Sequence, residues 1–520
     1  MLKVVLAIIF CIQFSSLSGN NIQVSNVVVT GQNTVDDYTF IEFDITWENS
    51  WRIVGSSDNW DAAWIFIKYR IGTSGAWNHA WLNDSGHLFC DGTSLTTGLL
   101  SPDLPFESTT NPALGVFLYM ANPGNGNFNC QNVQLRWNYG ANGVADNENI
   151  YLKVFAIEHV YVPEASFKIG SGGTETGAFY TYPNTTESFS INDESEITVG
   201  PSAGNLYYGP SAPGYSGDQQ GPIPSAYPKG FRAIYAMKYE ISQQGYVDFL
   251  NTLTRTQQQS RVRANIAGSS VTNQFVMPSS TTVNMRSGIW SFSSIPPSPS
   301  PVIFSCNFNA NLIPNEPNDG QNIACNFLLA QDVWAYLDWA GLRPMTELEY
   351  EKICRGPLNP VPNELAWGNN YLRSLQAFVN PGYANETFQD SFANYNGGTN
   401  LGPCRSGIFA KSYTDRIFSG GSFYGIMELS LNLWERAVTV GNITGRAFIG
   451  NHGDGLIGAN ADANATSWPT GTLGGGGSLR GGGGTDIAYH VSNRTYGSWP
   501  TINGGFVNWD GGRGVRTAPQ

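Results

Sequence analysis

The fold is decided by the stretch Asp338-Trp-Ala-Gly-Leu-Arg-Pro-Met-Thr-Glu-Leu-Glu-Tyr-Glu351. Apolar residues at helical spacing precede Gly341, and a glycine at this position is a typical helix stop. Thr346 and Glu349 form a capping box, which marks the start of a helix at Glu347. The stretch therefore predicts one helix that ends at Gly341 and a second that begins a few residues later.

The region before this stretch, residues 20–160, predicts a different kind of structure. Apolar and polar residues alternate in Phe43–Trp47, Ile65–Tyr69 and Val133–Tyr139, as half-buried antiparallel strands require. Turns rich in Gly and Asn separate these runs, so we predict an antiparallel β-sandwich. Four tryptophans in this region are interpreted as core and turn packing, with a sugar-stacking platform as the alternative: Trp60, Trp64, Trp77 and Trp81.

Residues 161–520 mix short helices with long loops. A helix is predicted after Ser242, which can act as its cap. The Pro-, Gly- and Ser-rich stretches 200–228 and 295–301 are typical of surface loops. Beyond residue 360 helical periodicity gives way to loops and short strands rich in Gly, Asn and aromatic residues. The predicted fold class is therefore α+β.

Several segments of this second region match a known family in their order along the chain. They are Val162-Pro-Glu-Ala-Ser-Phe167, Met237-Lys-Tyr-Glu240, Asp338–Glu351, Arg355-Gly356, Ala366-Trp-Gly368-Asn369, Gly425-Ile-Met-Glu428-Leu-Ser-Leu-Asn432-Leu-Trp434-Glu435, Arg480-Gly-Gly482 and Gly514-Val-Arg516. The region resembles the formylglycine-generating enzyme (sulfatase-modifying factor) family, with an insertion near 255–310. The resemblance implies a modified C-type-lectin-like fold with little regular secondary structure.

The resemblance also bears on catalysis. Oxidase members of the family bind copper through two cysteines in the segment after the Arg-Gly-Gly motif. The matching segment, Gly481 to Tyr496, contains no cysteine, and a copper(I) site needs thiolates. Related iron enzymes need three histidines, but His79, His87 and His159 fall in the first region. We therefore predict no catalytic residues, no copper and no iron.

Calcium is the metal that the resemblance favours. Carried over by position, Glu428 and Glu435 would supply side-chain ligands, and Leu431 and Leu433 would supply carbonyl oxygens, a hard oxygen set that suits calcium. Leu431 stands where the family has glycine. The alternative is that both glutamates are solvated or bind an arginine such as Arg436. Asn394 matches part of a second family site.

The first residues predict export. Residues 1–19 combine a basic start, an apolar run and small residues, which is typical of a cleaved signal peptide. No later segment is apolar enough to span a membrane, so we expect a secreted or cell-surface protein. Six cysteines remain after residue 19, and an even number in an exported chain suggests disulfides. We predict that Cys90 pairs with Cys130 and leave the pairing of the other four open.

Charge and loop composition limit the classes of molecule that the protein is expected to bind. The chain has 27 Lys and Arg against 40 Asp and Glu, a formal net charge of -13, and its few cations do not cluster, which argues against a nucleic-acid partner. The glycine runs at 474–477 and 481–484 lack the sequence context of nucleotide loops. An Asn/Asp/Gly-rich group could bind a cation or a sugar, or simply form turns: Asn451, His452, Asp454, Asn460, Asp462 and Asn464.

These observations predict an exported, non-catalytic, calcium-stabilised protein. It would recognise a protein or glycan at the cell surface, or build an extracellular filament or coat by self-assembly. The alternative is a metal-dependent oxidase or oxygenase of the same superfamily that uses other chemistry.

Overall fold

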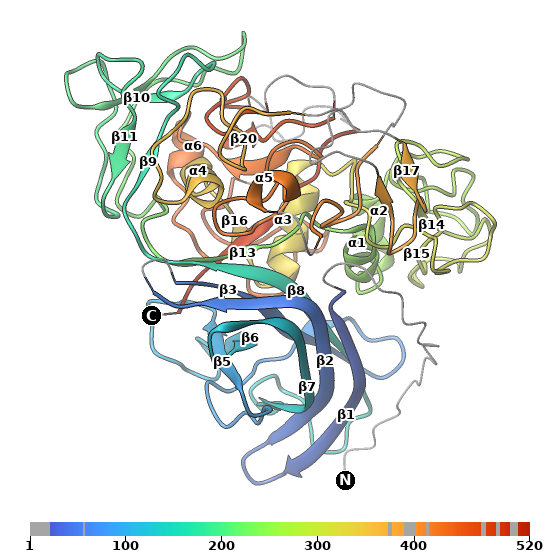
Figure 1. Ribbon diagram of the computed structural model, residues 1–520. Helices are drawn as coiled ribbons and strands as arrows, with labels where there is room; N and C mark the ends of the chain where they lie inside the picture. The colour runs from blue at the N-terminus through green and yellow to red at the C-terminus, as the bar shows by residue number, and fades with distance from the viewer. Residues whose placement is uncertain are drawn as a thin grey trace.

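A computed structural model describes residues 21–55, 58–372, 377–388, 402–411, 415–469, 475–484, 489–499 and 508–519. Over these residues the chain is an α+β protein built mainly of antiparallel sheet, with six helices, which confirms the predicted fold class (Figure 1). Among the described helices, none is long and apolar enough to cross a membrane.

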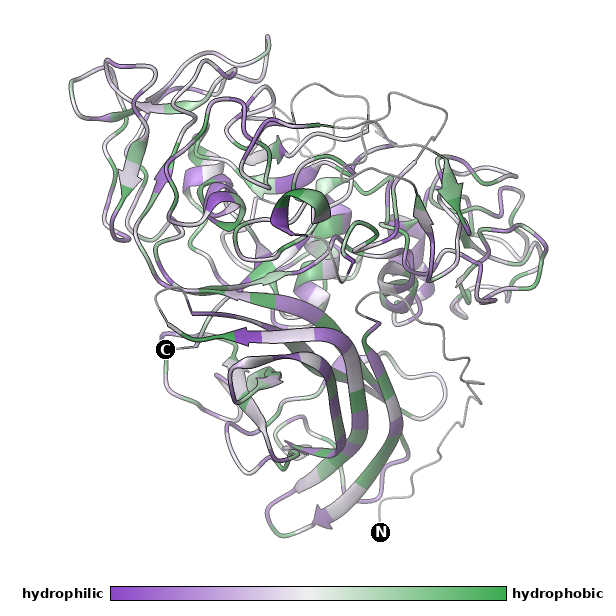
Figure 2. Ribbon diagram, in the orientation of Figure 1, coloured by the Kyte–Doolittle hydropathy of each residue, from purple (hydrophilic) through white to green (hydrophobic). Residues whose placement is uncertain are grey.

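The N-terminal part consists of long, bent antiparallel strands. They are β1 (Gln23–Asn33), β2 (Tyr38–Ile53), β3 (Asn59–Ile71), β4 (Asn78–His79), β5 (Thr93–Leu99), β6 (Ala113–Met120), β7 (Gly124–Trp137) and β8 (Ile150–Val162). β2 pairs with β1 and β7, whereas β3 pairs with β6 and β8. Buried and partly buried residues alternate along β2, and Figure 2 shows the matching alternation of apolar and polar residues. The predicted strand pattern at Phe43–Trp47 is confirmed.

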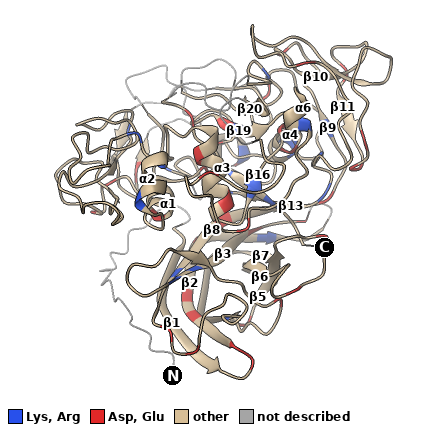
Figure 3. Cartoon of the chain, turned by 180° about the vertical axis from the view of Figure 1, so that it is seen from behind, with Lys and Arg blue, Asp and Glu red and all other residues tan. Residues whose placement is uncertain are grey.

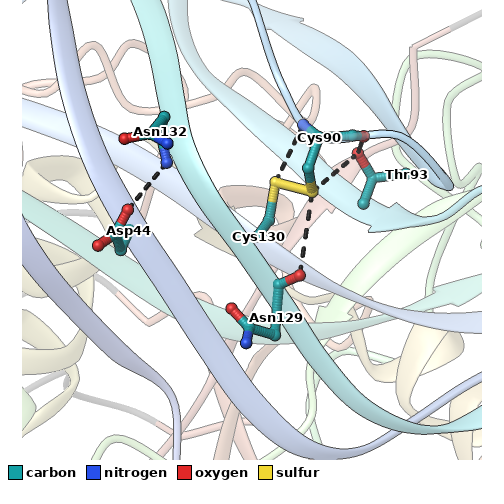
Figure 4. Close-up of a disulfide and its surroundings, with 6 residues drawn as sticks. All are labelled: Asp44, Cys90, Thr93, Asn129, Cys130 and Asn132. Carbon is teal, nitrogen blue, oxygen red and sulfur yellow. Dashed lines mark hydrogen bonds between the residues drawn. A yellow bond between two sulfur atoms is a disulfide. The ribbon is translucent and has the colours of Figure 1, made fainter.

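The strands of the N-terminal part enclose one apolar core. It contains Phe43 and Ile45 of β2, Ile65 of β3, Val116 of β6 and Leu135 of β7, all fully buried. The disulfide between Cys90 and Cys130, whose Cα atoms are 5.5 Å apart, cross-links segments that pack around this core. Figure 4 shows this bridge beside Thr93, whose hydroxyl donates to the Cys90 carbonyl at 2.7 Å.

The predicted pairing of Cys90 with Cys130 is therefore confirmed. The other four cysteines, Cys306, Cys325, Cys354 and Cys404, are free thiols, and all are buried. The even number of cysteines thus does not reflect complete pairing.

The sheet of the N-terminal part continues into the rest of the chain. Its strand order is β1-β2-β3-β8-β13-β21-β16, where the last three are β13 (Ile234–Met237), β21 (Gly514–Thr517) and β16 (Arg343–Pro344). Ala236 of β13 lies opposite Val160 of β8 and Val515 of β21. Residues near 160, 236 and 515 are therefore neighbours in one sheet.

The helices gather on the C-terminal side of this sheet (Figure 1). They are α1 (Gln243–Leu250), α2 (Arg255–Arg261), α3 (Ala330–Trp339), α4 (Glu347–Arg355) and the single turns α5 (Arg416–Ser419) and α6 (Ile443–Arg446). The capping box of α4 forms: Glu349 N–H donates to Thr346 Oγ1 at 3.1 Å, and Thr346 N–H donates to Glu349 Oε2 at 2.9 Å. The helices predicted after Ser242, before Gly341 and from Glu347 are confirmed as α1, α3 and α4.

The remaining strands form two-stranded sheets among long loops. They are β9 (Phe167–Ile169) with β11 (Phe189–Ile191), β10 (Phe179–Thr181) with β12 (Leu206–Tyr208), β14 (Ile289–Trp290) with β15 (Ser305–Cys306), β17 (Phe378–Val379) with β18 (Thr387–Phe388), and β19 (Glu435–Val438) with β20 (Gly477–Arg480).

A second apolar core joins the two parts of the molecule. Trp64 of β3 and Phe117 of β6 belong to the same buried cluster as Trp334 and Leu337 of α3. Trp60 stacks on Tyr161 with ring centroids 3.8 Å apart. Trp60 and Trp64 are therefore packing residues, as interpreted from the sequence, and the buried interface makes the two parts one continuous structure.

Candidate functional site

Four of the five predicted metal ligands lie in one buried loop and in the first residue of β19: Glu428, Leu431, Leu433 and Glu435. Glu428, Leu431 and Asn432 adopt left-handed φ angles of 54°, 67° and 63°. Such angles disfavour residues with a β-carbon, so the surroundings must hold the loop in place. Two contacts do this: Leu431 N–H donates to the Gly481 carbonyl, and Tyr350 hydroxyl donates to the Leu429 carbonyl, both at 2.6 Å.

Three carboxylates meet at this loop. Glu428 and Glu435 are 4% and 0% exposed, and Glu240, which precedes α1, joins them at 2%. Glu240 accepts hydrogen bonds from Leu433 N–H at 3.0 Å and from Asn432 Nδ2 at 2.5 Å. Sequence reasoning placed Glu240 in a family motif but gave it no role, because its loop partners are almost 200 positions away.

Arg513 supplies the positive charge at the centre of the cluster. Its Nε donates to Glu435 Oε1 at 2.5 Å, and both side chains are fully buried. The terminal nitrogens donate to backbone carbonyls, Nη1 to Lys238 at 3.2 Å and Nη2 to Glu428 at 3.2 Å. The alternative that a glutamate binds an arginine thus holds for Glu435, with Arg513 in place of Arg436.

Burial dominates the electrostatics of the cluster, and the attraction of Arg513 is the next largest effect on the pKa of each of the three glutamates. Burial raises the pKa of Glu428 to about 7, against the attraction of Arg513. Burial also raises the pKa of Glu240, and the neighbouring Glu435 and Glu428 carboxylates raise it further. Two carboxylate oxygens, Glu428 Oε2 and Glu435 Oε2, are buried without a hydrogen-bond partner.

Part of the oxygen set around this loop is already engaged with Arg513. Calcium takes six to eight oxygen ligands, but Glu435 Oε1 and the Glu428 carbonyl already accept hydrogen bonds from Arg513. Over the described ranges, no group of three or more His, Cys, Asp or Glu side chains is arranged to hold a metal ion. Asn394, of the second predicted site, lies outside the described residues.

Cys354 and Cys404 are two of the four free thiols, and apolar side chains enclose both. Cys354 and Cys404 are each 0% exposed and belong to different apolar clusters. Burial raises the pKa of Cys354 to about 12 and that of Cys404 well above its ordinary value. Both thiols are therefore protonated in the metal-free protein.

A separate cleft of about 620 Å³ opens between the N-terminal strands and the C-terminal loops. The segments 100–103 and 225–232 form part of its wall, and Arg343 and Glu349 line it from β16 and α4. Four members of the Asn/Asp/Gly-rich group line it too: Asn451, His452, Asp454 and Asn464. Asp462 does not line the cleft and instead forms an ion pair with Arg261 at 2.8 Å.

Both arginines that line the cleft are paired with carboxylates, whereas the lining carboxylates Glu194 and Asp454 form no ion pair among the described residues. Arg232 forms an ion pair with Asp103 at 2.5 Å, and Arg343 forms one with Glu349 at 2.6 Å. Figure 3 shows acidic residues on α3 and both acidic and basic residues around α4. The amides and hydroxyls of the lining are further groups that can hydrogen-bond to a ligand.

Two asparagines illustrate this polar lining. Asn451 donates through Nδ2 to Thr466 Oγ1 at 2.8 Å. Asn464 is held by its backbone N–H, which donates to Asp338 Oδ2 at 2.8 Å, and its side chain is exposed. His452 is buried beside them and accepts a hydrogen bond from Thr517 N–H at 3.0 Å. Burial and the nearby Arg516 hold its pKa well below the ordinary value, so the imidazole is neutral.

Comparison of the sequence with models of known families and with characterised proteins finds no match.

Proposed function

We propose that the protein is exported, is not an enzyme, and recognises neutral glycans in the cleft between its N-terminal strands and its C-terminal loops. In this proposal residues 20–160 are a β-sandwich domain and residues 161–520 a formylglycine-generating-enzyme-like domain of C-type-lectin-like fold. The observation that carries the proposal is the cleft itself, which gathers Asn451, Asp454 and Asn464 in a volume of about 620 Å³. A volume of this size is within the usual range for small-molecule sites.

The pairing of both lining arginines disfavours an anionic ligand. The two arginines that line the cleft, Arg232 and Arg343, are both committed to carboxylates. An anionic ligand would have to break these pairs. Amide and hydroxyl groups such as those of Asn464 and Thr466 suit the hydroxyls of a sugar, because each can donate and accept.

The buried thiols support the absence of oxidase chemistry. Each free cysteine is buried, and the described parts of the segment from Gly481 to Tyr496 offer hydroxyls, an amide and one imidazole. We therefore expect only background copper-dependent oxygen consumption with a cysteine-containing sulfatase peptide. Turnover with that peptide would contradict the non-catalytic part of the proposal.

The binding part is tested by titrating neutral oligosaccharides into the wild type and into two alanine variants. Asn464→Ala removes an exposed amide from the cleft, whereas Asn460→Ala removes an exposed amide of the same loop that does not line it. Loss of a ligand hydrogen bond costs about 1 kcal/mol, or roughly fivefold in affinity. We expect this weakening for Asn464→Ala and no change for Asn460→Ala.

Two outcomes would count against glycan recognition. One is the absence of binding across a broad panel of neutral oligosaccharides. The other is equal affinity of wild type and Asn464→Ala for a sugar that does bind. Assembly of the purified wild type into filaments, seen by electron microscopy, would instead support a structural subunit.

A further inference from the structure

We infer that Arg513 is the resident cation of the loop 428–435 and takes the place that a metal ion would need there. The inference rests on the oxygen atoms that surround its guanidinium. These are Oε1 of Glu435 and the backbone carbonyls of Glu428, Lys238 and Met237, at donor-acceptor distances of 2.5 to 3.4 Å. One carboxylate and several carbonyls are also the kind of shell that calcium takes.

The backbone fixes where this guanidinium lies. Arg513 directly precedes β21, which pairs with β13 on one side and with β16 on the other. The residues on both sides of it are also tied down: the Gly512 carbonyl accepts from Ile241 N–H at 3.0 Å, and Gly514 N–H contacts the Met237 sulfur at 3.1 Å. The side chain of Arg513 therefore has little freedom to leave the loop.

Charge excludes a second cation at the same carboxylate. Glu435 and Arg513 form a fully buried ion pair. An arginine keeps its proton in proteins, so a calcium ion at Glu435 would stand beside a permanent positive charge in a poorly solvated environment. Repulsion at such short range is large. The loop 428–435 should therefore keep its structure without bound calcium, whether or not the cleft binds a glycan.

Removal of the guanidinium should uncover the cation site. In Arg513→Ser the Glu435 carboxylate loses its ion pair, and it joins Glu428 Oε2, which already lacks a hydrogen-bond partner. The freed space is lined by carboxylate and carbonyl oxygens. Calcium added to this variant should therefore bind and stabilise it.

The experiment measures calcium content and melting temperature in chelator and in millimolar calcium chloride. For the wild type we expect no bound calcium after gel filtration and the same melting temperature in both buffers. For Arg513→Ser we expect a lower melting temperature in chelator and a rise of several degrees with calcium.

The matched control is Arg436→Ser, which breaks another buried arginine-carboxylate pair, with Asp510. This variant should also be destabilised but should not respond to calcium, because the wild-type Arg513 still lies in the loop.

Stoichiometric calcium in the wild type, with a lower melting temperature after chelation, would overturn the inference. A folded Arg513→Ser that ignores calcium would overturn it as well. If that variant does not fold, the wild-type measurement alone decides.

Discussion

The guanidinium carbon of Arg516 lies 4.5 Å from the centre of the Trp64 ring, so the last strand in the chain, β21, and β3 meet through one side chain. Arg516 also donates to the carbonyls of Gly341 and Leu99. Arg516, which belongs to β21, thus contacts both the N-terminal strands and Gly341, which closely follows α3. Burial lowers its pKa to about 9, which is the cost of placing a charge at this junction.

Replacement of this arginine should destabilise the whole molecule. Arg516→Leu leaves the Gly341 and Leu99 carbonyls without their donors and removes the contact with Trp64. Loss of hydrogen bonds to a charged group costs about 1.5 to 3 kcal/mol each, so we expect a loss of roughly 3 to 5 kcal/mol. Urea unfolding followed by tryptophan fluorescence and by far-ultraviolet circular dichroism measures it, and the two probes should coincide because the sheet is continuous.

Arg70→Leu is the matched control for that variant. Arg70 lies over Trp77 at 5.0 Å, but both side chains are partly exposed. An exposed cation-π contact is worth about 0.5 to 1 kcal/mol. Equal losses for the two variants would show that the position of Arg516 at the junction has no special importance.

The free thiols should be hidden in the native protein. For a chain that begins at residue 20, we expect no thiol to react with Ellman's reagent in native buffer, because Cys306, Cys325, Cys354 and Cys404 are buried. In denaturant the same protein should show four thiols, and after reduction six, since the Cys90–Cys130 bridge then opens. A thiol that reacts within minutes in native buffer would contradict this prediction and reopen the oxidase alternative.

The disulfide should contribute measurably to stability. Cys90 and Cys130 are 40 positions apart, and closing a loop of that size stabilises a folded state by about 4 kcal/mol. We expect the double variant Cys90→Ser/Cys130→Ser to unfold at a correspondingly lower urea concentration. The control is the reduced wild type, which should unfold close to the double variant. A double variant as stable as the oxidised wild type would contradict the expected role of the bridge.

Local sequence signals predicted the elements that depend on local interactions. The capping box of Thr346 and Glu349 and the alternation along β2 depend on neighbouring residues, and both are found in the structure. Helix α2 was not predicted, although the sequence carries a signal for it. Thr254 and Gln257 form a capping box at its start. That signal lies at the start of the predicted insertion near 255–310, in which no helix was predicted.

Contacts between segments that are far apart in the chain could not be predicted from the sequence. β13 has only four residues, all buried, so it reads as a short apolar run with no indication that its neighbours lie near 160 and 515. The partner of Glu435 was missed for the same reason: Arg513 is 78 positions away, whereas Arg436 is adjacent. The cleft likewise joins residues near 100 to residues near 450.

The last prediction concerns acid. His159 is 0% exposed, donates through Nδ1 to the Ile157 carbonyl at 3.0 Å, and has Nε2 buried without a partner. Burial and, to a smaller extent, the charge of Arg516 lower the pKa of His159 to about 3, against the hydrogen bond to the Ile157 carbonyl. In the unfolded chain a histidine has a pKa of about 6.5. The unfolded state therefore takes up a proton below pH 6.5 while the folded state does not.

The contribution of His159 to stability is thus complete above pH 6.5 and is lost as the pH falls toward 3. Between pH 7 and pH 4 the loss should be about 3 kcal/mol. Buried carboxyl groups with raised pKa values, such as Asp338 and Asp510, act in the opposite direction over this range. A comparison of variants cancels their effect. His159→Gln should therefore lose about 3 kcal/mol less than the wild type between these pH values, measured by urea unfolding.

His490→Gln serves as the control, because this imidazole is only partly buried and its pKa is lowered to a smaller extent by burial. Its replacement should change the pH dependence less than His159→Gln does. If both variants follow the wild-type pH dependence, then the His159 imidazole becomes protonated in the folded state without penalty, which would mean that water reaches its buried Nε2.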